Sequence, residues 1–357
     1  MTGMFGMSIN SVVMTIGAIG AINGSVWQPS PDFQFIALDD AALEIFGNAR
    51  VEILATMPEG RTAHEAPVWV PGNNTVWYAS NRYGQDKDQF VDIEHVHLGT
   101  GSITTIAHNE IRMANGGTNL KDEIVFCAQG DGFDYFSAGL YTLNPATLET
   151  KVLLNNYRGV PFNSPNDVDI HKPTGSLWFT DPPYGHVFRY RDVPLMPSQV
   201  YVFFPATGEV RAVADQLVRP NGIGFSPDFK TLYVSDTGKD YEGSGPVFPM
   251  YPASIYAYDV SADLMLTNRR LFAYVDNGVP DGFKLDVYGR LYVGCGDGVH
   301  IFQGVGAPGA GRLLGKILTG GKTSANLVFA GKDLKSLIIL CEKYILRVNL
   351  TVPGFPR

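Results

Sequence analysis

The amino-acid sequence predicts an all-β protein, a six-bladed β-propeller of four-stranded antiparallel blades. Three observations carry this prediction. The 357 residues include 40 Gly and 23 Pro, which is typical of many short strands joined by tight turns. A segment of two alternating strands around a turn recurs six times along the chain. A second pair of strands follows most of these segments, which completes four strands per unit.

The six repeats all begin at a residue with a carboxylate or carboxamide side chain. Each continues with an apolar alternating run, a turn and a second strand that ends in a small or polar residue. The starts lie 50, 51, 55, 60 and 45 residues apart, at Glu65, Asn115, Asn166, Asn221, Asp281 and Asn326. This spacing indicates one supersecondary unit repeated with loops of variable length.

The ends of the chain indicate how the ring closes. The last unit shows only three strands and finishes at YILRVNL, whereas RVEILAT at residues 50–56 precedes the first unit and belongs to none. We expect residues 50–56 to supply the missing outer strand and so remove an exposed sheet edge. The propeller would then cover residues 38–357, with a short helix at residues 39–46 and a tail outside the propeller at residues 1–37. The alternative, two separate β-domains, would leave residues 50–56 unpaired.

Residues 1–22 carry no charged side chain and contain the apolar stretch SVVMTIGAIGAI. The stretch resembles the apolar part of a signal peptide, but no basic residue precedes it. Its Gly and Asn content argues against a stable membrane span. Secreted and intracellular locations both remain open.

Charge and cysteine content exclude several classes of protein. The net charge of −8 provides no basic surface for nucleic acid and favours a small-molecule partner. The three cysteines show no CxxC spacing and lie in apolar runs, which indicates buried thiols. Neither a zinc site nor a disulfide framework is predicted.

The six repeat starts predict a ring of oxygen ligands. In a four-stranded meander, the starts of the first strands and the ends of the second strands meet on one face, around the central channel. Oxygen atoms from Asp, Glu and Asn suit a hard cation such as Ca²⁺, and the absence of His and Cys disfavours Zn²⁺. Asn-Gly and Asp-Gly are also common turn dipeptides. The same chemical class at the same point of all six repeats favours the metal site.

At these residues the chain resembles the regucalcin/gluconolactonase/LRE-like family, especially its fungal lactonohydrolase members, over residues 65–348. The most specific stretches are SPNDVDIHKPTGSLWFTDPPYG, RPNGIGFSPDFKTLYVSDTG and PDGFKLDVYGRLYVGCGDGV. The resemblance implies a six-bladed propeller that holds a divalent cation, usually Ca²⁺, in its central tunnel and hydrolyses sugar lactones. Zn²⁺, Mn²⁺ and Mg²⁺ are alternative cations.

The resemblance also implies residue roles. The implied metal ligands are Glu65, Asn166, Asn221 and Asp281. Ala66 stands where the family commonly has Gly, a small departure. Asn115 and Asn326 fall where related propellers place groups that face the substrate or support the ligands.

The ends of the second strands form a further polar ring, with Asn81, Arg82, Gln129, Asp181, Asp236 and Asp297. We expect Asp181 and Tyr184 of the DPPYG loop to contact a hydroxylated substrate. Arg82 is a candidate for a carbonyl or carboxylate contact, with a surface salt bridge as the alternative. Together with Asn115 and Asn326, these residues are the predicted substrate-binding set. Asp236 and Asp297 are interpreted as caps of their own loops.

Two long connections, residues 182–198 and 236–253, are predicted to form lids on the same face. Their aromatic and methionine residues are expected to shape a partly apolar pocket. These residues are Phe188, Tyr190, Met196, Phe248, Met250 and Tyr251.

The predicted function is metal-dependent lactone hydrolysis. The cation would polarise the ester carbonyl while a carboxylate, Asp281 first and Glu65 second, activates water. His64 is expected to point away because neighbours on a strand face opposite sides. No GxSxG motif offers a serine nucleophile.

Three alternatives share the fold: phosphotriester hydrolysis, rearrangement or cyclisation in a biosynthetic pathway, and non-catalytic Ca²⁺ binding. The oligomeric state stays open.

Overall fold

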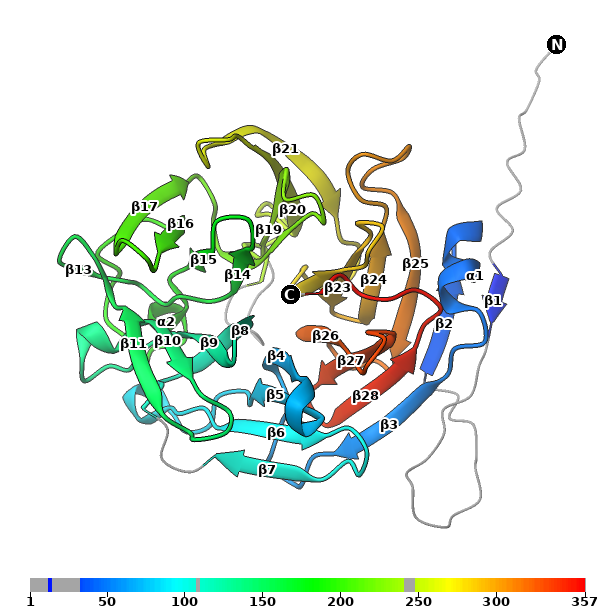
Figure 1. Ribbon diagram of the computed structural model, residues 1–357, viewed down its shortest axis with the longest axis horizontal. Helices are drawn as coiled ribbons and strands as arrows, with labels where there is room; N and C mark the ends of the chain where they lie inside the picture. Colours follow the sequence, from blue (N-terminus) through cyan, green and yellow to red (C-terminus); the bar gives the residue numbers. More distant parts are fainter. Residues whose placement is uncertain (1–11, 15–32, 107–109, 241–247, 357) are drawn as a thin grey trace.

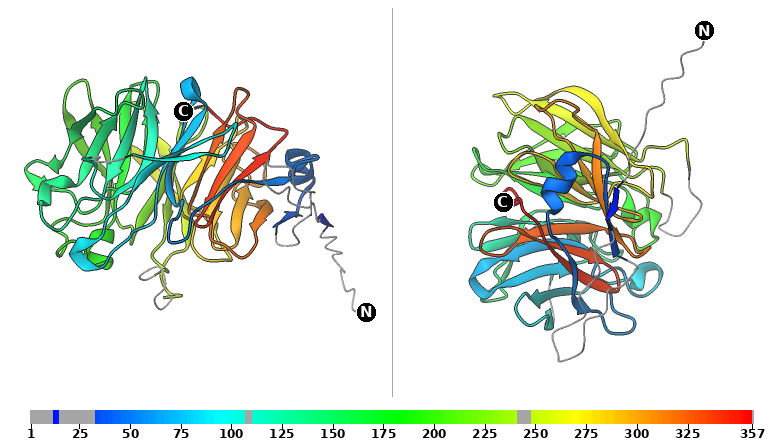
Figure 2. Two further views of the ribbon diagram at one scale, coloured as in Figure 1. Left: turned by 90° about the horizontal axis from the view of Figure 1, so that it is seen from below. Right: turned by 90° about the vertical axis from the view of Figure 1, so that its right-hand side faces the viewer.

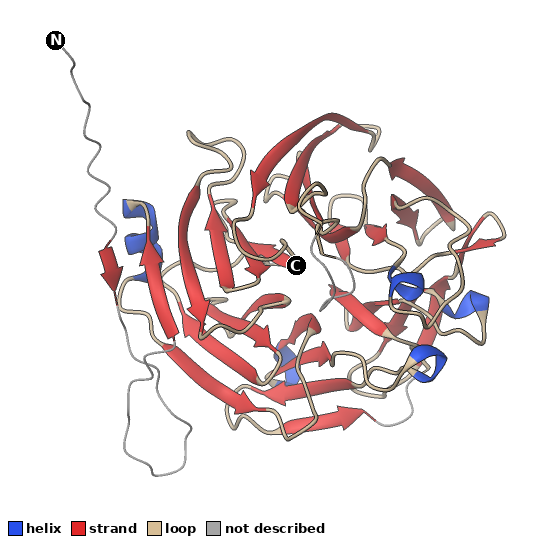
Figure 3. Cartoon of the chain, turned by 180° about the vertical axis from the view of Figure 1, so that it is seen from behind, coloured by secondary structure: helices blue, strands red, loops and turns tan. Residues whose placement is uncertain are grey.

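Six sheets surround a central axis in the computed structural model, which describes residues 12–14, 33–106, 110–240 and 248–356 (Figure 1). The predicted six-bladed propeller of four-stranded antiparallel blades is therefore confirmed. Strands dominate the view from behind, where the helices are a few short segments (Figure 3). Within the described residues, no helix has the length and apolar content to cross a membrane. The predicted signal peptide at residues 1–22 lies outside the described residues, apart from β1 (Val12–Met14).

The strands of each blade follow one another outwards from the axis. Blade one contains β4 (Glu65–Val70), β5 (Thr75–Ala79), β6 (Ile93–His97) and β7 (Ile103–Ile106). Blade two contains β8 (Ala114–Leu120), β9 (Glu123–Ala128), β10 (Gly139–Leu143) and β11 (Thr150–Leu154). Blade three contains β14 (Val168–His171), β15 (Ser176–Asp181), β16 (Gln199–Phe204) and β17 (Glu209–Ala214).

The second half of the ring repeats the same order. Blade four contains β18 (Pro220–Phe225), β19 (Thr231–Asp236), β20 (Ser254–Val260) and β21 (Leu266–Tyr274). Blade five contains β22 (Phe283–Leu285), β23 (Leu291–Cys295), β24 (Gly298–Phe302) and β25 (Leu313–Thr319). Blade six contains β26 (Asn326–Ala330), β27 (Ser336–Cys341), β28 (Tyr344–Asn349) and β3 (Val51–Thr56).

Short elements fill the connections between these strands. A small hairpin of β12 (Asn156–Tyr157) and β13 (Val160–Pro161) precedes blade three. The helical turns are η1 (Pro71–Asn73), η2 (Asp86–Asp88), η3 (Tyr135–Ser137) and α2 (Tyr184–Val187).

β3 closes the ring as the sequence predicted. It pairs antiparallel with β28, with Val51 opposite Val348 and Thr56 opposite Tyr344. Arg347 of β28 reinforces the pair with two hydrogen bonds to the carboxylate of Glu52, at 2.8 and 2.6 Å. Strands from the two ends of the chain thus complete one blade, which leaves no gap in the ring.

The segment before β3 extends blade five, in contrast to the expected tail. β2 (Phe33–Ala37) pairs with β25, so this part of residues 1–37 belongs to the propeller sheet. The helix α1 (Asp40–Phe46) follows, close to the predicted residues 39–46, and Asp39 caps it by accepting from the backbone N–H of Ala41. Both elements lie at the outer edge of the ring (Figure 2). The sequence signal was weak because β2 has only five residues and no turn partner nearby.

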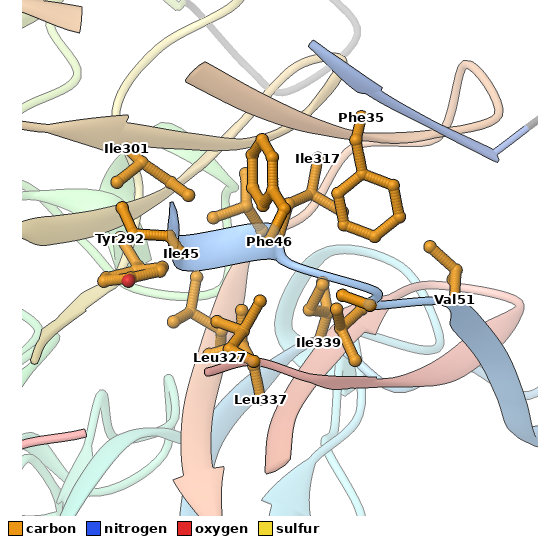
Figure 4. Close-up of a cluster of buried hydrophobic side chains, with 14 of the residues drawn as sticks. Phe35, Ile45, Phe46, Val51, Tyr292, Ile301, Ile317, Leu327, Leu337 and Ile339 are labelled. Atoms are coloured by element: carbon orange, nitrogen blue, oxygen red, sulfur yellow. The ribbon is translucent and has the colours of Figure 1, made fainter. Parts of the chain in front are cut away.

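α1 holds blades five and six together through its apolar face. Ile45 and Phe46 are buried among Phe35, Ile317 and Ile339 (Figure 4). Because Phe35 comes from β2, Ile317 from β25 and Ile339 from β27, the helix joins the segment added outside the ring to two blades. Burial of side chains of this size stabilises the fold by about 2 kcal/mol each.

Six apolar cores lie between neighbouring blades, and alternate residues of one strand serve two of them. Trp178 of β15 packs toward blade four, whereas its neighbour Phe179 packs toward blade two. Successive side chains of a β-strand point to opposite faces of the sheet, so neighbouring residues of one strand pack into different cores. Cys127, Cys295 and Cys341 are buried thiols in these cores and form no disulfide, as expected.

Candidate functional site

One mouth of the central channel holds a pocket of about 670 Å³, here called the front pocket. The first strand of each blade begins near this mouth, so polar residues from several blades converge there. Glu65, Asn166, Asn221 and Asp281, the four predicted metal ligands, all line the pocket. Asn115, Tyr184 and Arg82 of the predicted substrate-binding set line it as well.

β-bulges and glycines direct this convergence. The register shifts at Glu65–Val68, Ala114–Gly117 and Pro220–Ile223, so the strands depart from simple alternation where they enter the pocket. A Cβ on Gly116 would lie 2.2 Å from Oδ1 of Asp167, and one on Gly282 would lie 2.2 Å from Nδ2 of Asn326. The glycines after Asn115 and Asp281 therefore allow the next blade to approach.

Several oxygen atoms of the front pocket have no hydrogen-bond partner among the described residues. They are the buried Oδ1 atoms of Asn115, Asn166 and Asp281. Leaving a buried polar atom unpaired costs about 1–3 kcal/mol. Three such atoms in one pocket indicate a site arranged for a group other than the protein's own donors.

Glu65 and Asp281 bring two carboxylates into this pocket. Burial, and next the negative charge of Glu65, raise the pKa of Asp281 well above its ordinary value. Oε2 of Glu65 accepts a hydrogen bond of 2.8 Å from Nδ2 of Asn326. Asn326 is buried behind Glu65 and is absent from the pocket lining, so its contact is to the carboxylate and not to the pocket space.

His64 lines the front pocket, which corrects the expectation that it points away. The alternation fails because the bulge begins at Glu65 and Ala66 adopts a φ of 52°, a left-handed conformation that favours glycine. Nδ1 of His64 lies 2.5 Å from Oε1 of Glu342. Burial alone would lower the pKa of His64, but the charge and hydrogen bond of Glu342 raise it to about 9.

Arg82 and Tyr184 form part of the pocket wall beside the connection at residues 182–198. The guanidinium carbon of Arg82 lies 3.5 Å from the ring centroid of Phe188, and burial lowers the pKa of this arginine. The hydroxyl of Tyr184 accepts a 3.2 Å hydrogen bond from Nδ2 of Asn221 and contacts Thr237. Both side chains therefore face the pocket, and the surface salt bridge considered for Arg82 is absent from the described residues.

Asp181 lies beneath the pocket surface and not in its lining. It is fully buried, and its carboxylate accepts hydrogen bonds from the backbone N–H groups of Asn163 and Ser164, at 3.0 and 2.7 Å. Asp236 makes the same kind of contact with Val218 and Arg219, as expected for a loop cap. Asp181 fixes the chain before Asn166, so its contact with a substrate stays a prediction.

The connection at residues 182–198 is anchored over the front pocket. Tyr190 donates a 2.5 Å hydrogen bond to Gln129, and Arg191 donates to the carbonyl oxygen of Phe162. Of the six residues expected to give the pocket an apolar wall, Phe188 lines it. Met250 is 96% exposed, and Tyr190 is buried within the connection. Phe188 is therefore the member of this set for which a place in the pocket wall is confirmed.

Glu342 and Asp167 were not among the residues predicted from the sequence. Glu342 directly follows the second strand of blade six, and the rule that selected Asp181 and Asp297 would also have selected it. Asp167 follows Asn166 and is fully buried, with its Oδ2 atom unpartnered among the described residues. Burial raises the pKa of Asp167 to about 7, in spite of the opposing charge of Lys284. No motif in the sequence distinguished it from a strand residue.

The donor set of the front pocket fits a hard divalent cation. No three His, Cys, Asp or Glu side chains of the described chain gather closely enough to hold a metal. A cation would therefore depend on amide oxygens as well as on Glu65 and Asp281. Carboxylates mixed with Asn oxygens are typical of Ca²⁺ sites, whereas Zn²⁺ sites prefer His and Cys.

Comparison with known proteins gives three results of different scope. The family described as SMP-30/Gluconolactonase/LRE-like region matches residues 63–342. Lactonohydrolase oryL of Aspergillus oryzae is 33% identical over 339 residues, which cover 88% of this chain and 73% of that protein. A gluconolactonase structure from Xanthomonas campestris superposes with a TM-score of 0.70 at 28% identity, over 87% of this chain and 92% of that chain.

A more distant structure shares the fold alone. Regucalcin of Agrobacterium tumefaciens, described as a calcium-binding protein, superposes with a TM-score of 0.61 at 18% identity. The superposition covers 85% of this chain and 94% of that chain.

Proposed function

The chain belongs to the SMP-30/gluconolactonase/LRE-like family, and we propose that it is a lactonase that holds a divalent cation, by preference Ca²⁺, in the front pocket. The unpartnered oxygens of Asn166 and Asp281 are the observation that carries the proposed cation, and the unpartnered oxygen of Asn115 in the same pocket is left for the substrate. The oxygens of Asn166 and Asp281 lie in one pocket with Glu65, so a cation there would satisfy both at once.

Glu65, Asn166, Asn221 and Asp281 would hold the cation, and Mg²⁺, Mn²⁺ and Zn²⁺ are weaker candidates. When bound, the cation supplies Lewis-acid polarisation of the lactone carbonyl. The lactonohydrolase and gluconolactonase relatives support the lactone as the substrate class.

Asp281 is the proposed general base, with Glu65 as the second candidate. Asp281 lines the front pocket, and its buried Oδ1 atom has no hydrogen-bond partner among the described residues, so this oxygen is placed to accept a proton from water. Asp281 removes a proton from water as the water oxygen bonds to the carbonyl carbon. The ring C–O bond then breaks, and the leaving oxygen takes the proton, which yields a hydroxy acid.

Other residues of the front pocket bind and orient the substrate in this proposal. Arg82, held by Phe188, faces the pocket as a hydrogen-bond donor for the carbonyl oxygen. Asn115, Gln129 and Tyr184 provide amide and hydroxyl groups for the hydroxyls of a sugar lactone. The imidazole of His64, whose pKa is raised to about 9 mainly by Glu342, is protonated at neutral pH and interacts favourably with the carboxylates of Glu65 and Asp281.

A pH-stat assay of acid release tests the proposal. The panel contains glucono-, galactono-, pantoyl and aromatic lactones, and the protein is assayed before EDTA, after EDTA, and after addition of Ca²⁺, Mg²⁺, Mn²⁺ or Zn²⁺. We expect acid release that stops with EDTA and returns best with Ca²⁺.

Two further arms distinguish the alternatives. A phosphotriester is offered under the same conditions, and each lactone is also followed by mass spectrometry for isomeric products. Turnover of the phosphotriester alone would replace the lactonase proposal. Isomerisation without uptake of water would assign the front pocket to rearrangement, and Ca²⁺ binding without any turnover would make the protein a binding propeller.

A further inference from the structure

A second pocket of about 470 Å³ lies at the other mouth of the channel, and we call it the rear pocket. The first strand of each blade runs from one pocket to the other. β4 begins at Glu65 in the front pocket and ends near Trp69 and Pro71 in the rear pocket. β22 and the residues before it likewise lead from Asp281 to Lys284. Phe355 and Pro356, which follow blade six in the sequence, line this pocket as well.

The rear pocket gathers positive charge in a protein whose net charge is −8. Lys121, Lys284 and Lys332 line it, and none of them makes a hydrogen bond or ion pair with the described residues. Lys284 interacts electrostatically with buried Asp167 but lies beyond ion-pair distance. Asp169, the acid in the lining, is 4% exposed and accepts hydrogen bonds from the backbone N–H groups of Ile170 and Phe225. The lysine charges are therefore available to a ligand.

The remaining wall of the rear pocket is mostly apolar. Trp69, Phe283 and Phe329 come from blades one, five and six, and Phe355 comes from the C-terminal segment. Gly117 of blade two and Gly224 of blade four also line the pocket, and a Cβ on Gly224 would lie 2.9 Å from the ring of Phe283. Ligand pockets of this size combine apolar walls with a few polar groups that fix orientation.

We propose that the rear pocket binds an amphipathic organic anion. The carboxylate or phosphate head contacts Lys284 together with Lys121 and Lys332, and the hydrocarbon or aromatic body lies on Trp69 and Phe329. Ammonium groups recognise such heads through charge-assisted hydrogen bonds. Three unpaired lysines above aromatic walls carry this inference, which is independent of the reaction proposed for the front pocket.

Isothermal titration calorimetry of the full chain with octanoate and octyl phosphate tests the proposal. Octanamide and inorganic phosphate serve as probes that lack the charge or the apolar body. We expect one equivalent of octanoate or octyl phosphate to bind, and the tighter of the two identifies the head group. Octanamide and inorganic phosphate should bind at least tenfold more weakly.

Lysine variants locate the bound anion. K284M should weaken octanoate binding at least tenfold, and K121M and K332M, whose side chains are exposed, should each weaken it with little risk to folding. K151M removes an equal charge from the outer strand of blade two and should leave the affinity unchanged. R82Q in the front pocket should also leave it unchanged.

Three results would overturn the proposal. Octanamide binding as tightly as octanoate would show that the lysines do not contribute. Affinity lost in R82Q but retained in the three lysine variants would assign the anion to the front pocket. Failure of all four probes to bind would leave the rear pocket without the proposed ligand.

Discussion

In the proposed mechanism, lactone hydrolysis depends most on Glu65 and Asp281. D281N and E65Q keep side-chain size but remove a negative charge that a cation requires. We expect either change to lower kcat/KM for the best lactone roughly a hundredfold to ten-thousandfold, with circular dichroism unchanged. E149Q on the exposed outer part of blade two provides a matched control. Near-native rates in D281N or E65Q would show that its role is assigned wrongly.

Asn326 acts through Glu65 in this account. N326L keeps the branching at Cγ but removes the amide that donates to Oε2 of Glu65 at 2.8 Å and the oxygen that accepts from the backbone N–H of Leu327. Groups that orient a metal ligand typically contribute ten- to a hundredfold in affinity or activity, so we expect Ca²⁺ affinity to fall about that much. The affinity is measured by calorimetry, and the unfolding midpoint is recorded alongside. A lower midpoint with unchanged Ca²⁺ affinity would reduce Asn326 to a structural role.

The sequence predicted the positions of the polar residues at the strand starts. It did not predict the contacts that each of these side chains makes. Glu65, Asn166, Asn221 and Asp281 line one pocket because the repeat fixes the start of each first strand. Asn326 occupies the same repeat position, yet its amide donates to Glu65 of blade one and lies against Gly282 of the neighbouring blade five. The orientation of His64 depends on a β-bulge and on the left-handed backbone conformation of Ala66. Neither feature can be predicted from the alternation of residues along a strand.

At the scale of elements, blade five is held together by an ionic cluster between β24 and β25. Asp297 contacts Nε2 of His300 at 2.6 Å and Nζ of Lys316 at 3.2 Å. Burial alone would raise the pKa of Asp297, but these two partners lower it below its ordinary value of 3.8. The carboxylate therefore stabilises the fold above pH 3.8, and this stability is lost as the pH falls below that value.

The D297N variant tests this dependence of stability on pH. We expect it to lower the free energy of unfolding by about 2 kcal/mol at neutral pH, and to flatten the fall in stability as the pH is lowered below 3.8. Urea unfolding at a series of pH values measures both effects, with exposed D263N as the control. A D297N curve parallel to that of the unchanged protein would contradict the assignment.

Elements that repeat, or that have a clear local pattern, could be predicted from the sequence. A strand that pairs with a distant part of the chain could not. The six blades, the closing strand β3 and the helix α1 follow from repeat spacing and apolar pattern. β2 has five residues that join blade five across about 280 positions of sequence, so no local pattern indicated its partner β25. The connection at residues 182–198 was predicted as a lid from its length. The hydrogen bond between Tyr190 and Gln129 that anchors it joins residues far apart in the sequence and could not be predicted.

The whole ring depends on the join between the two ends of the chain. Val51 of β3 is fully buried between the outer segment and blade six, opposite Val348. V51A should lower the free energy of unfolding by about 2 kcal/mol, because it removes buried methyl groups and leaves a small cavity. V152A on β11 makes the same change at a side chain that is 55% exposed and should cost less than 0.5 kcal/mol. Equal urea midpoints for the two variants would contradict a closing role for β3.

We propose that one cation in the front pocket makes this propeller a lactonase. The most direct test measures Ca²⁺ binding and lactone hydrolysis together, as Ca²⁺ is returned to the EDTA-treated protein. We predict one bound Ca²⁺ per chain and an activity curve that follows the binding curve with the same midpoint, both lost in D281N. Full activity in protein that holds no bound metal, or saturation with Ca²⁺ without any lactone hydrolysis, would contradict the claim.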